Sequence, residues 1–323
     1  MIFDTIIGEF LHQNLFSDEV KKCGNIAVAA TIDMFSQFNK TMLPIPSRFH
    51  YLFNLRDISS VVQGILMTKP QSILDSKVFT RLWLHECQRV FHDRLIDEKD
   101  RQYFKDLAME LIHMKFKEKW EVEELFETNF EEKRLTVTFS MILKCDYEDK
   151  LYEEIKDPAK LLRILEDKML DYNYTFTQNQ MSLIFFEDAI NHICRITRIL
   201  NQPRGNAMLI GVSGCGKQSL TKLAAFLHEA NCSQIKLSKN YKPSNFREDI
   251  KEILLKAGCE RKPNVFLMAD TQIVHEQFLE DIDCILNTGE IADLYEKDDI
   301  ERMETALQKF MKEHKIPMSQ DNI

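Results

Sequence analysis

Residues 207–219 read AMLIGVSGCGKQS, a short apolar run that ends in a glycine-rich turn carrying one lysine. The residues that follow, SLTKLAAFL, have the spacing of a helix. Because Gly211, Gly214 and Gly216 lack a Cβ atom, the backbone N–H groups of the turn can point together at an anion. Lys217 adds a positive charge at the start of the new helix, where the helix dipole already favours phosphate. In the order strand, loop and helix, the pattern G-x-x-x-x-G-K predicts a nucleotide phosphate site; the alternative is a tight turn with a surface lysine.

The position after this lysine departs from the full pattern. A serine or threonine there binds Mg²⁺ through its hydroxyl, whereas this chain has Gln218. Ser219 comes one residue later, about 100° further round the helix. The amide oxygen of Gln218 can still coordinate Mg²⁺ or accept a hydrogen bond from a metal-bound water. We therefore expect nucleotide binding rather than efficient hydrolysis, with Cys215 included in the binding turn.

Length and composition indicate an ordinary globular protein. The 323 residues allow two domains, and 44% hydrophobic with 29% charged residues is typical of folded chains. A net charge of −9 argues against a general nucleic-acid binder. The eight cysteines occur singly, which predicts reduced thiols in an intracellular protein. We expect no signal peptide, because the N-terminus is acidic, and no membrane span, because no apolar run is long enough.

The N-terminal half is predicted to be mostly helical, because its apolar residues recur every three or four positions. The first run with the character of a strand is LTVTFSMIL, residues 135–143. The polar stretch 173–180 gives the predicted domain boundary, with domains at 1–172 and 173–323. The predicted helices are two in residues 1–40 with a break near Gly24, one in the second half of 50–66, two or three in 76–119, and one after Pro158.

Few polar residues of this half suggest a site. Asn54 or Asp57 is placed to cap the helix that follows. Arg56 lies at the entrance of that helix, and an arginine in such a place is by default solvated or salt-bridged. His85 and His92 are seven residues apart and share a helix face, but without a third ligand they do not predict a metal site.

The C-terminal half alternates between strands and helices. After the turn we predict a helix over 217–230, a strand at 234–238, a helix over 244–257 that stops at Gly258, a strand over 263–270, and a helix that ends at Gly289. The alternation predicts a parallel sheet with crossover helices. Ligands of such sheets bind at the carboxyl ends of the strands, which is where Lys217 and Asp270 lie.

VFLMAD, which ends at Asp270, has the form of a second phosphate-site motif. Its apolar residues predict a buried strand, and its carboxylate at the tip can hold Mg²⁺ or a metal-bound water. A buried strand that ends in aspartate is common, but one at this distance from Lys217 is a stronger signal. An efficient ATPase also needs a base to polarise the attacking water, and Thr271 cannot act as one near neutral pH. Gln218 and Thr271 both predict slow hydrolysis or none.

These stretches resemble the heavy chain of axonemal dynein. FEDAINHICRITRILNQPRGNAMLIGVSGCGKQSL resembles the entry into the fourth AAA+ module of the motor ring, and VFLMADTQI with FLEDIDCILNTGEI resembles its second motif and next helix. LPIPSRFHYLFNLRDISSVVQGIL and HECQRVFHDRL look like the small lid domain that closes the third module. The resemblance covers nearly the whole chain.

The resemblance implies a fold and a function. The fold is a helical lid with connecting helices, followed by a partial P-loop AAA+ α/β domain. The function is that of an ATP-driven, minus-end-directed microtubule motor of cilia and flagella, in which the first module does most of the hydrolysis and the fourth is regulatory. Arg56 corresponds to the lid arginine that senses the γ-phosphate of the third module, whose own P-loop is not in this sequence.

The same resemblance implies cofactors, partners and a location. The cofactors are ATP or ADP with Mg²⁺, and the location is the cytoplasmic cytoskeleton of the axoneme. The partners are the other AAA+ modules, dynein intermediate and light chains, and microtubules through a stalk that this sequence lacks, with no nucleic acid and no membrane. We assign no catalytic residue. The predicted nucleotide-binding residues are Gly211, Gly214, Cys215, Gly216, Lys217, Gln218, Ser219, Asp270 and Arg56, and the predicted metal ligands are Gln218, Ser219 and Asp270.

One strand of the implied sheet is missing from the sequence. It would lie between the strand before the turn and the strand ending in Asp270, so we expect unpaired edges on both. We also expect that the chain alone does not drive microtubule gliding. Two alternatives stay open: an interaction module that does not use nucleotide, and an unrelated P-loop kinase or midasin-type relative, although no acceptor-site base suggests a kinase.

Overall fold

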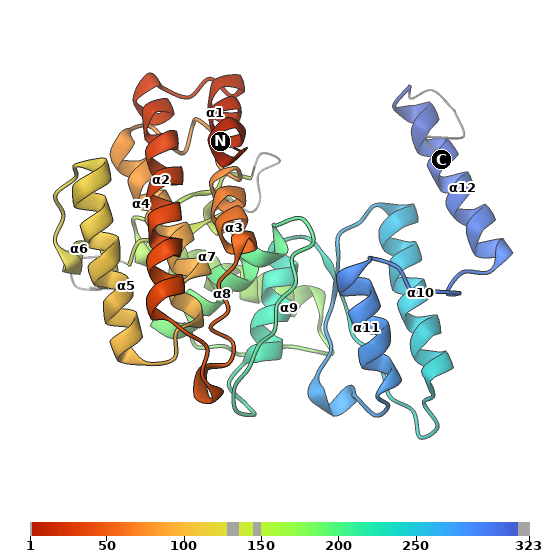
Figure 1. The fold of residues 1–323 in the computed structure, drawn as a ribbon. Coiled ribbons are helices and arrows are strands. Elements are labelled where there is room, and N and C mark those ends of the chain that lie inside the picture. The colour runs from red at the N-terminus through yellow and green to blue at the C-terminus, as the bar shows by residue number, and fades with distance from the viewer. Residues whose placement is uncertain (1, 128–135, 145–149, 316–323) are drawn as a thin grey trace. The chain divides into compact units, whose positions relative to one another are not determined.

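The computed structural model describes residues 2–127, 136–144 and 150–315. The chain forms two compact units, Met1–Ile199 and Leu200–Ile323, which are described separately (Figure 1). Their boundary lies further along the chain than the predicted boundary at 172/173. The reason is helix α8 (Glu187–Leu200), whose arginines form ion pairs with the first unit.

The first unit is mostly helical, and its only strands in the described ranges form a two-stranded antiparallel pair. The predicted strand at 135–143 is reduced to two residues because the chain turns into a 3-10 helix directly after Met141; residue 135 lies outside the described ranges. The elements are α1 (Ile2–Gln13), α2 (Asp18–Thr41), η1 (Pro46–Arg48), α3 (Leu55–Ile65), α4 (Ser76–Val90), η2 (His92–Arg94), α5 (Glu98–Leu111), the π-helical turn η3 (Ile112–Phe116), α6 (Val122–Phe126), β1 (Phe139–Ser140), η4 (Ile142–Lys144), β2 (Glu153–Glu154), α7 (Pro158–Thr175) and α8.

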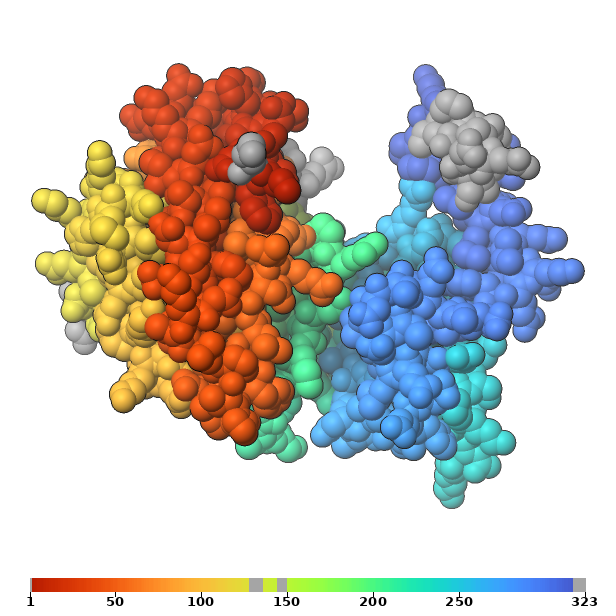
Figure 2. Space-filling view, in the orientation of Figure 1, coloured from red at the N-terminus to blue at the C-terminus, as the bar shows by residue number. Residues whose placement is uncertain are grey.

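Helices α1 and α2 confirm the prediction of two helices in residues 1–40, but the break is not at Gly24. It falls before Asp18, where the Ser17 hydroxyl accepts a hydrogen bond from the Val20 N–H and caps α2. Gly24 lies inside α2, and a Cβ atom there would be 2.7 Å from Leu11 Cδ1 of α1. The glycine therefore allows close packing of the two helices, which run along one face of the unit (Figure 2).

Helix α3 begins as the sequence predicts. The Asn54 side chain accepts a hydrogen bond from the Arg56 N–H at 2.8 Å, and Asp57 Oδ2 accepts one from the Asn54 N–H at 2.7 Å. This reciprocal cap satisfies N–H groups that a helix start otherwise leaves free. Helix α4 lies in the core, with Trp83 fully buried and its Nε1–H donating to the Thr31 hydroxyl of α2 at 2.9 Å.

The second unit contains a small parallel sheet. Strands β3 (Asn231–Ser233) and β4 (Asn264–Phe266) pair from Asn231 with Asn264 to Ser233 with Phe266. Together with the lid-like first unit, this confirms the predicted fold class. The other elements of the unit are α9 (Lys217–Leu227), α10 (Pro243–Glu260), η5 (Asp270–Gln272), α11 (Gln277–Asn287) and α12 (Lys297–Glu313).

Several predicted boundaries in this unit are wrong, among them the end of α9 at Leu227 in place of residue 230. Residues 234–238 do not form the predicted strand, because the strand β3 lies earlier and ends at Ser233. The Ile235 carbonyl accepts a hydrogen bond from the Gln272 side chain at 2.6 Å instead of from a strand. The strand predicted at 263–270 is shortened to β4. Helix α10 continues past Gly258 to Glu260 and ends at Arg261, which has φ +55°, just before Pro263. Gly289, at φ +84°, follows the end of α11 as predicted.

Residues 207–212, predicted as the strand before the turn, form no strand. Met208, Ile210 and Val212 are 86%, 85% and 79% exposed, and no strand in the described part of the chain lies beside them. A strand needs a neighbour to satisfy its backbone groups. The finding agrees with the expected unpaired edge, but the prediction of a formed strand is wrong.

Candidate functional site

The glycine-rich turn has the backbone that its sequence suggests. Gly214 and Gly216 have φ values of +80° and +81°, in the left-handed region that side chains disfavour. Nothing lies within 4 Å of the place that a Cβ atom would take at either residue. Gly216 is the N-cap of α9, and no side chain caps this helix start. The N–H groups at the start of α9 are thus available to an anion.

Lys217 is held by its own turn. Its Nζ donates to the carbonyl oxygens of Gly211 and Val212, both at 2.7 Å, and lies 3.5 Å from Cys215 Sγ. A Cβ atom on Gly211 would lie 3.2 Å from the same sulfur. Both carbonyl partners are neutral, and hydrogen bonds to ionised acceptors are roughly twice as strong. A phosphate group can therefore compete for the ammonium group.

Gln218 and Ser219 lie on the first turn of α9 without fixed partners. Gln218 is exposed and Ser219 is half-buried. Neither side chain makes a hydrogen bond with the described residues. Their amide and hydroxyl oxygens are of the type that Mg²⁺ accepts.

Asp270 begins η5, a short distance after the end of β4. It is exposed, and its Oδ1 accepts a hydrogen bond from the Thr271 N–H at 2.9 Å. Within the described ranges, no ion pair or hydrogen bond joins Asp270 to Lys217. The structure therefore brings together Gly211, Cys215 and Lys217, while the meeting of Asp270 with them stays a prediction.

Gln272 supports this corner, and the sequence patterns do not reveal it. Its Oε1 accepts from the Ala269 N–H at 2.8 Å, and its Nε2 donates to the Ile235 carbonyl at 2.6 Å. The side chain is 8% exposed. It thus ties the turn that carries Asp270 to the segment after β3. The signal for this role is that the Gln272 amide is buried close to the end of a strand. A sequence does not show which side chains are buried, so this role could not be predicted from it.

Arg56 lies in the first unit, on the first turn of α3. It is exposed, and its guanidinium group forms no ion pair within the described residues. The helix start beneath it is fixed, because Asp57 Oδ1 pairs with Arg94 Nη2 at 2.5 Å. Its predicted role as a phosphate sensor stays a prediction.

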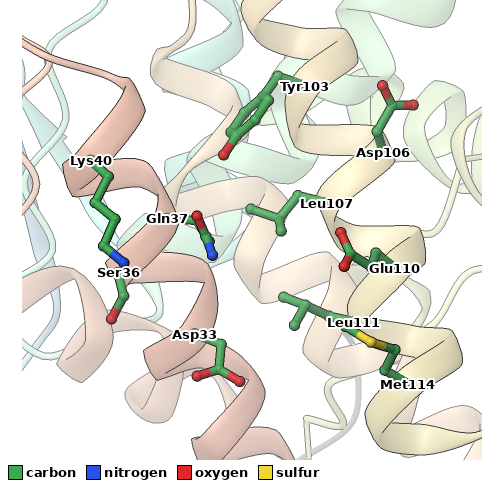
Figure 3. Close-up of a pocket in the computed structure, with 10 residues that line it drawn as sticks. All are labelled: Asp33, Ser36, Gln37, Lys40, Tyr103, Asp106, Leu107, Glu110, Leu111 and Met114. Atoms are coloured by element: carbon green, nitrogen blue, oxygen red, sulfur yellow. The ribbon is translucent and has the colours of Figure 1, made fainter.

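A cavity of about 500 Å³ lies elsewhere in the first unit, between α2 and α5 with η3 (Figure 3). It contains none of the predicted site residues, and its lining mixes carboxylates with leucine and methionine side chains. In the described ranges, no three histidine, cysteine or acidic side chains gather as a metal site. None of the helices there combines the length and apolar character needed to cross a bilayer.

Two family models match the chain. The model described as P-loop containing dynein motor region D4 matches residues 181–323. The model described as AAA+ lid domain matches residues 27–127. They fall on the second and first halves of the chain, where the turn and the helical unit were described above.

Full-length relatives agree with these models. Dynein axonemal heavy chain 6 of Homo sapiens is 41% identical over 314 residues, which cover 97% of this chain and 7% of that protein. The Dynein-1-beta heavy chain of the flagellar inner arm I1 complex of Chlamydomonas reinhardtii is 39% identical over 300 residues, which cover 93% of this chain and 6% of that protein. The chain thus spans less than a tenth of the length of these relatives. It belongs to the axonemal dynein heavy chain family, in which it comprises an AAA+ lid followed by the P-loop motor region.

Proposed function

We propose that this chain is a segment of an ATP-driven, minus-end-directed microtubule motor of cilia and flagella, and that its P-loop binds ATP or ADP in a regulatory site with weak or no hydrolysis. The observation that carries the proposal is the cradle formed by the left-handed Gly214 and Gly216 with the ammonium group of Lys217. The partners proposed with it are the other AAA+ modules of the ring, dynein intermediate and light chains, and microtubules.

In this proposal each residue of the turn has a task. The N–H groups after Gly216 bind phosphate oxygens, and Lys217 leaves the carbonyls of Gly211 and Val212 to neutralise phosphate charge. The oxygens of Gln218, Ser219 and Asp270 are of the kind that would hold Mg²⁺, and the ion would supply positive charge against the phosphates.

The residues after the two motifs support slow hydrolysis. The side chain of Gln218 is longer than the hydroxyl expected there and places its oxygen differently. Thr271 stands where a base would polarise water, and its hydroxyl stays protonated near neutral pH. Arg56, from the lid unit, is proposed to sense the γ-phosphate of the third module, which that lid closes and whose P-loop is not in this sequence.

Titration of the chain with a fluorescent ATP analogue in excess Mg²⁺ tests the proposal. Losing a charge-assisted contact costs about 1.5–3 kcal/mol, so Lys217→Ala should raise Kd roughly 10-fold to 100-fold. Lys222→Ala removes the same charge from the same helix and should leave Kd near the wild-type value. Equal Kd values for wild type and Lys217→Ala would refute nucleotide binding at this turn.

That result would favour a second candidate, an interaction module that does not use nucleotide. The exposed side chains of Met208, Ile210 and Val212 support this candidate, because an exposed apolar segment without a strand partner could pair with a strand of another protein. The two candidates differ in one measurable respect: only the first predicts that Lys217 affects nucleotide affinity.

A further inference from the structure

Three helices of the first unit and the segment just before β2 meet at one buried carboxylate. Glu86 of α4 is fully buried. Its carboxylate pairs with the guanidinium group of Arg198 in α8, and its Oε1 accepts a hydrogen bond from the Tyr152 hydroxyl at 2.6 Å. Gly64 of α3 gives it space, because a Cβ atom there would overlap the Glu86 carboxylate.

The groups around Glu86 keep their protonation states, with Tyr152 neutral and Arg198 charged. Burial and then the Glu86 charge raise the pKa of the Tyr152 hydroxyl far above its ordinary value, so it stays a donor. Burial works against the Arg198 charge, but Glu86 and Tyr152 raise the pKa of Arg198. Removing one partner of such a pair leaves a buried charge without compensation, which is strongly destabilising. The Glu86 carboxylate therefore cannot leave Arg198 at low cost.

A second ion pair holds the same face of α8. Arg195 Nε lies 3.3 Å from Asp93 Oδ2, and Arg89 Nη1 lies 3.3 Å from the same oxygen. Residues 195 and 198 are three apart, so they project from one side of the helix. Helix α8 is thus fixed in position and in rotation against the end of α4.

Two of the helices joined at Glu86 carry or precede predicted nucleotide-binding residues, Arg56 for α3 and Lys217 for α8. Arg56 lies on the first turn of helix α3, and Gly64 follows about two turns later in the same helix. Helix α8 ends at Leu200, and the chain then continues through residues 201–206 toward the turn that carries Lys217. We infer that Glu86 is a positioning residue that couples α3, the helix of the lid arginine, to α8, the helix that leads into the P-loop. The inference rests on the proposed nucleotide site and adds a means of regulating it.

The coupling follows from packing without free space. A shift of α3 along its axis pushes the Gly64 backbone against the Glu86 carboxylate, which must then move Arg198 or lose it. Close-packed interiors transmit such shifts because they have few voids to absorb them. The effect is reciprocal, so nucleotide that orders the P-loop would also stabilise α3 through α8.

The test compares Gly64→Ala with Gly8→Ala in the intact chain. Both place a methyl group in a helix, but nothing lies within 4 Å of the new Cβ atom at Gly8. Hydrogen exchange of α8 reports the first link, and Kd for the fluorescent ATP analogue reports the second. Gly64→Ala should speed exchange in α8 roughly threefold to thirtyfold and raise Kd roughly twofold to tenfold, whereas Gly8→Ala should not speed exchange in α8 and should leave Kd unchanged.

A double-mutant cycle with Arg198→Lys completes the test. If Gly64 acts through Arg198, the two substitutions should combine with less than additive effects on Kd. Faster exchange in α8 with unchanged Kd would show a purely structural role and overturn the inference, as would unchanged exchange in α8. Failure of the proposed function is recognised separately, because analogue binding would then be insensitive to Lys217→Ala.

Discussion

Alanine at Gly24 and at Gly8 should change the stability of the first unit in opposite directions. A Cβ atom at Gly24 lies 2.7 Å from Leu11 Cδ1 and 3.0 Å from Ile7 Cγ2, and both of these side chains are fully buried. Inserting a methyl group into such a core costs about 1–3 kcal/mol. Replacing glycine within a helix returns about 0.5–1 kcal/mol, so we expect Gly24→Ala to destabilise by up to about 2.5 kcal/mol.

Gly8 provides the matched comparison because it lies in α1, where the new methyl group meets no atom within 4 Å. Gly8→Ala should therefore stabilise the unit by about 0.5–1 kcal/mol through helix propensity alone. Both tryptophans, Trp83 and Trp120, lie in this unit, so their fluorescence in urea reports its unfolding. Midpoints that shift the same way for both variants, at unchanged slope, would refute the packing argument.

Three further predictions concern other parts of the chain. Arg247 binds the buried Asp281 through Nε and Nη2, but the arginine side chain is partly exposed. Arg247→Leu should therefore destabilise α11 by about 1–3 kcal/mol, seen as faster hydrogen exchange there, and unchanged exchange would count against the pair. Burial and then Arg89 lower the pKa of His85 well below its ordinary value, so only the unfolded chain takes up its proton as pH falls below about 6.5. Keeping His85 neutral therefore costs the folded chain no stability above that pH, and below it the free energy of unfolding falls by up to about 1.4 kcal/mol per pH unit. The urea midpoints at pH 7.5 and 5.5 should thus differ less in His85→Gln than in wild type. Gln218→Thr restores a hydroxyl and should increase the ratio of nucleotide Kd in EDTA to Kd in Mg²⁺; an unchanged ratio would argue against a metal role for this position.

Local signals in the sequence predicted local structure well. The cap of α3 needs only Asn54 and Asp57, three residues apart, and both hydrogen bonds form. The end of α11 needs only a glycine that can adopt a positive φ, as Gly289 does. These features depend on neighbours along the chain, so a single sequence is sufficient to find them.

Features that depend on distant residues were missed or misplaced. The position of β3 depends on β4 and on the side chain of Gln272, which takes the carbonyl that a longer strand would use. The sequence predicts a helix break near Gly24, because the contact of Gly24 with α1 is not visible in the spacing of residues. Glu86 and Arg198 are 112 residues apart, and no local pattern connects them.

The candidate site also combines features set by neighbouring residues with features set by distant ones. The left-handed backbone at Gly214 and Gly216 follows from the glycine pattern, whereas the hydrogen bonds of Lys217 to Gly211 and Val212 depend on how the turn closes. The relation of Asp270 to the turn depends on the sheet, whose first strand does not form. The sequence therefore predicts the backbone of the turn, whereas the meeting of the turn with Asp270 stays a prediction.

The open backbone of residues 207–212 also governs how the chain should behave at high concentration. Three large apolar side chains are exposed on a segment that pairs with no strand in the described part of the chain, and such a segment can promote self-association. These residues directly precede the phosphate turn. If segment 207–212 of one molecule paired with the same segment of another, the phosphate turns of both molecules would lie within the aggregate. A charged residue at position 210 would oppose this stacking and keep the turns accessible as monomers.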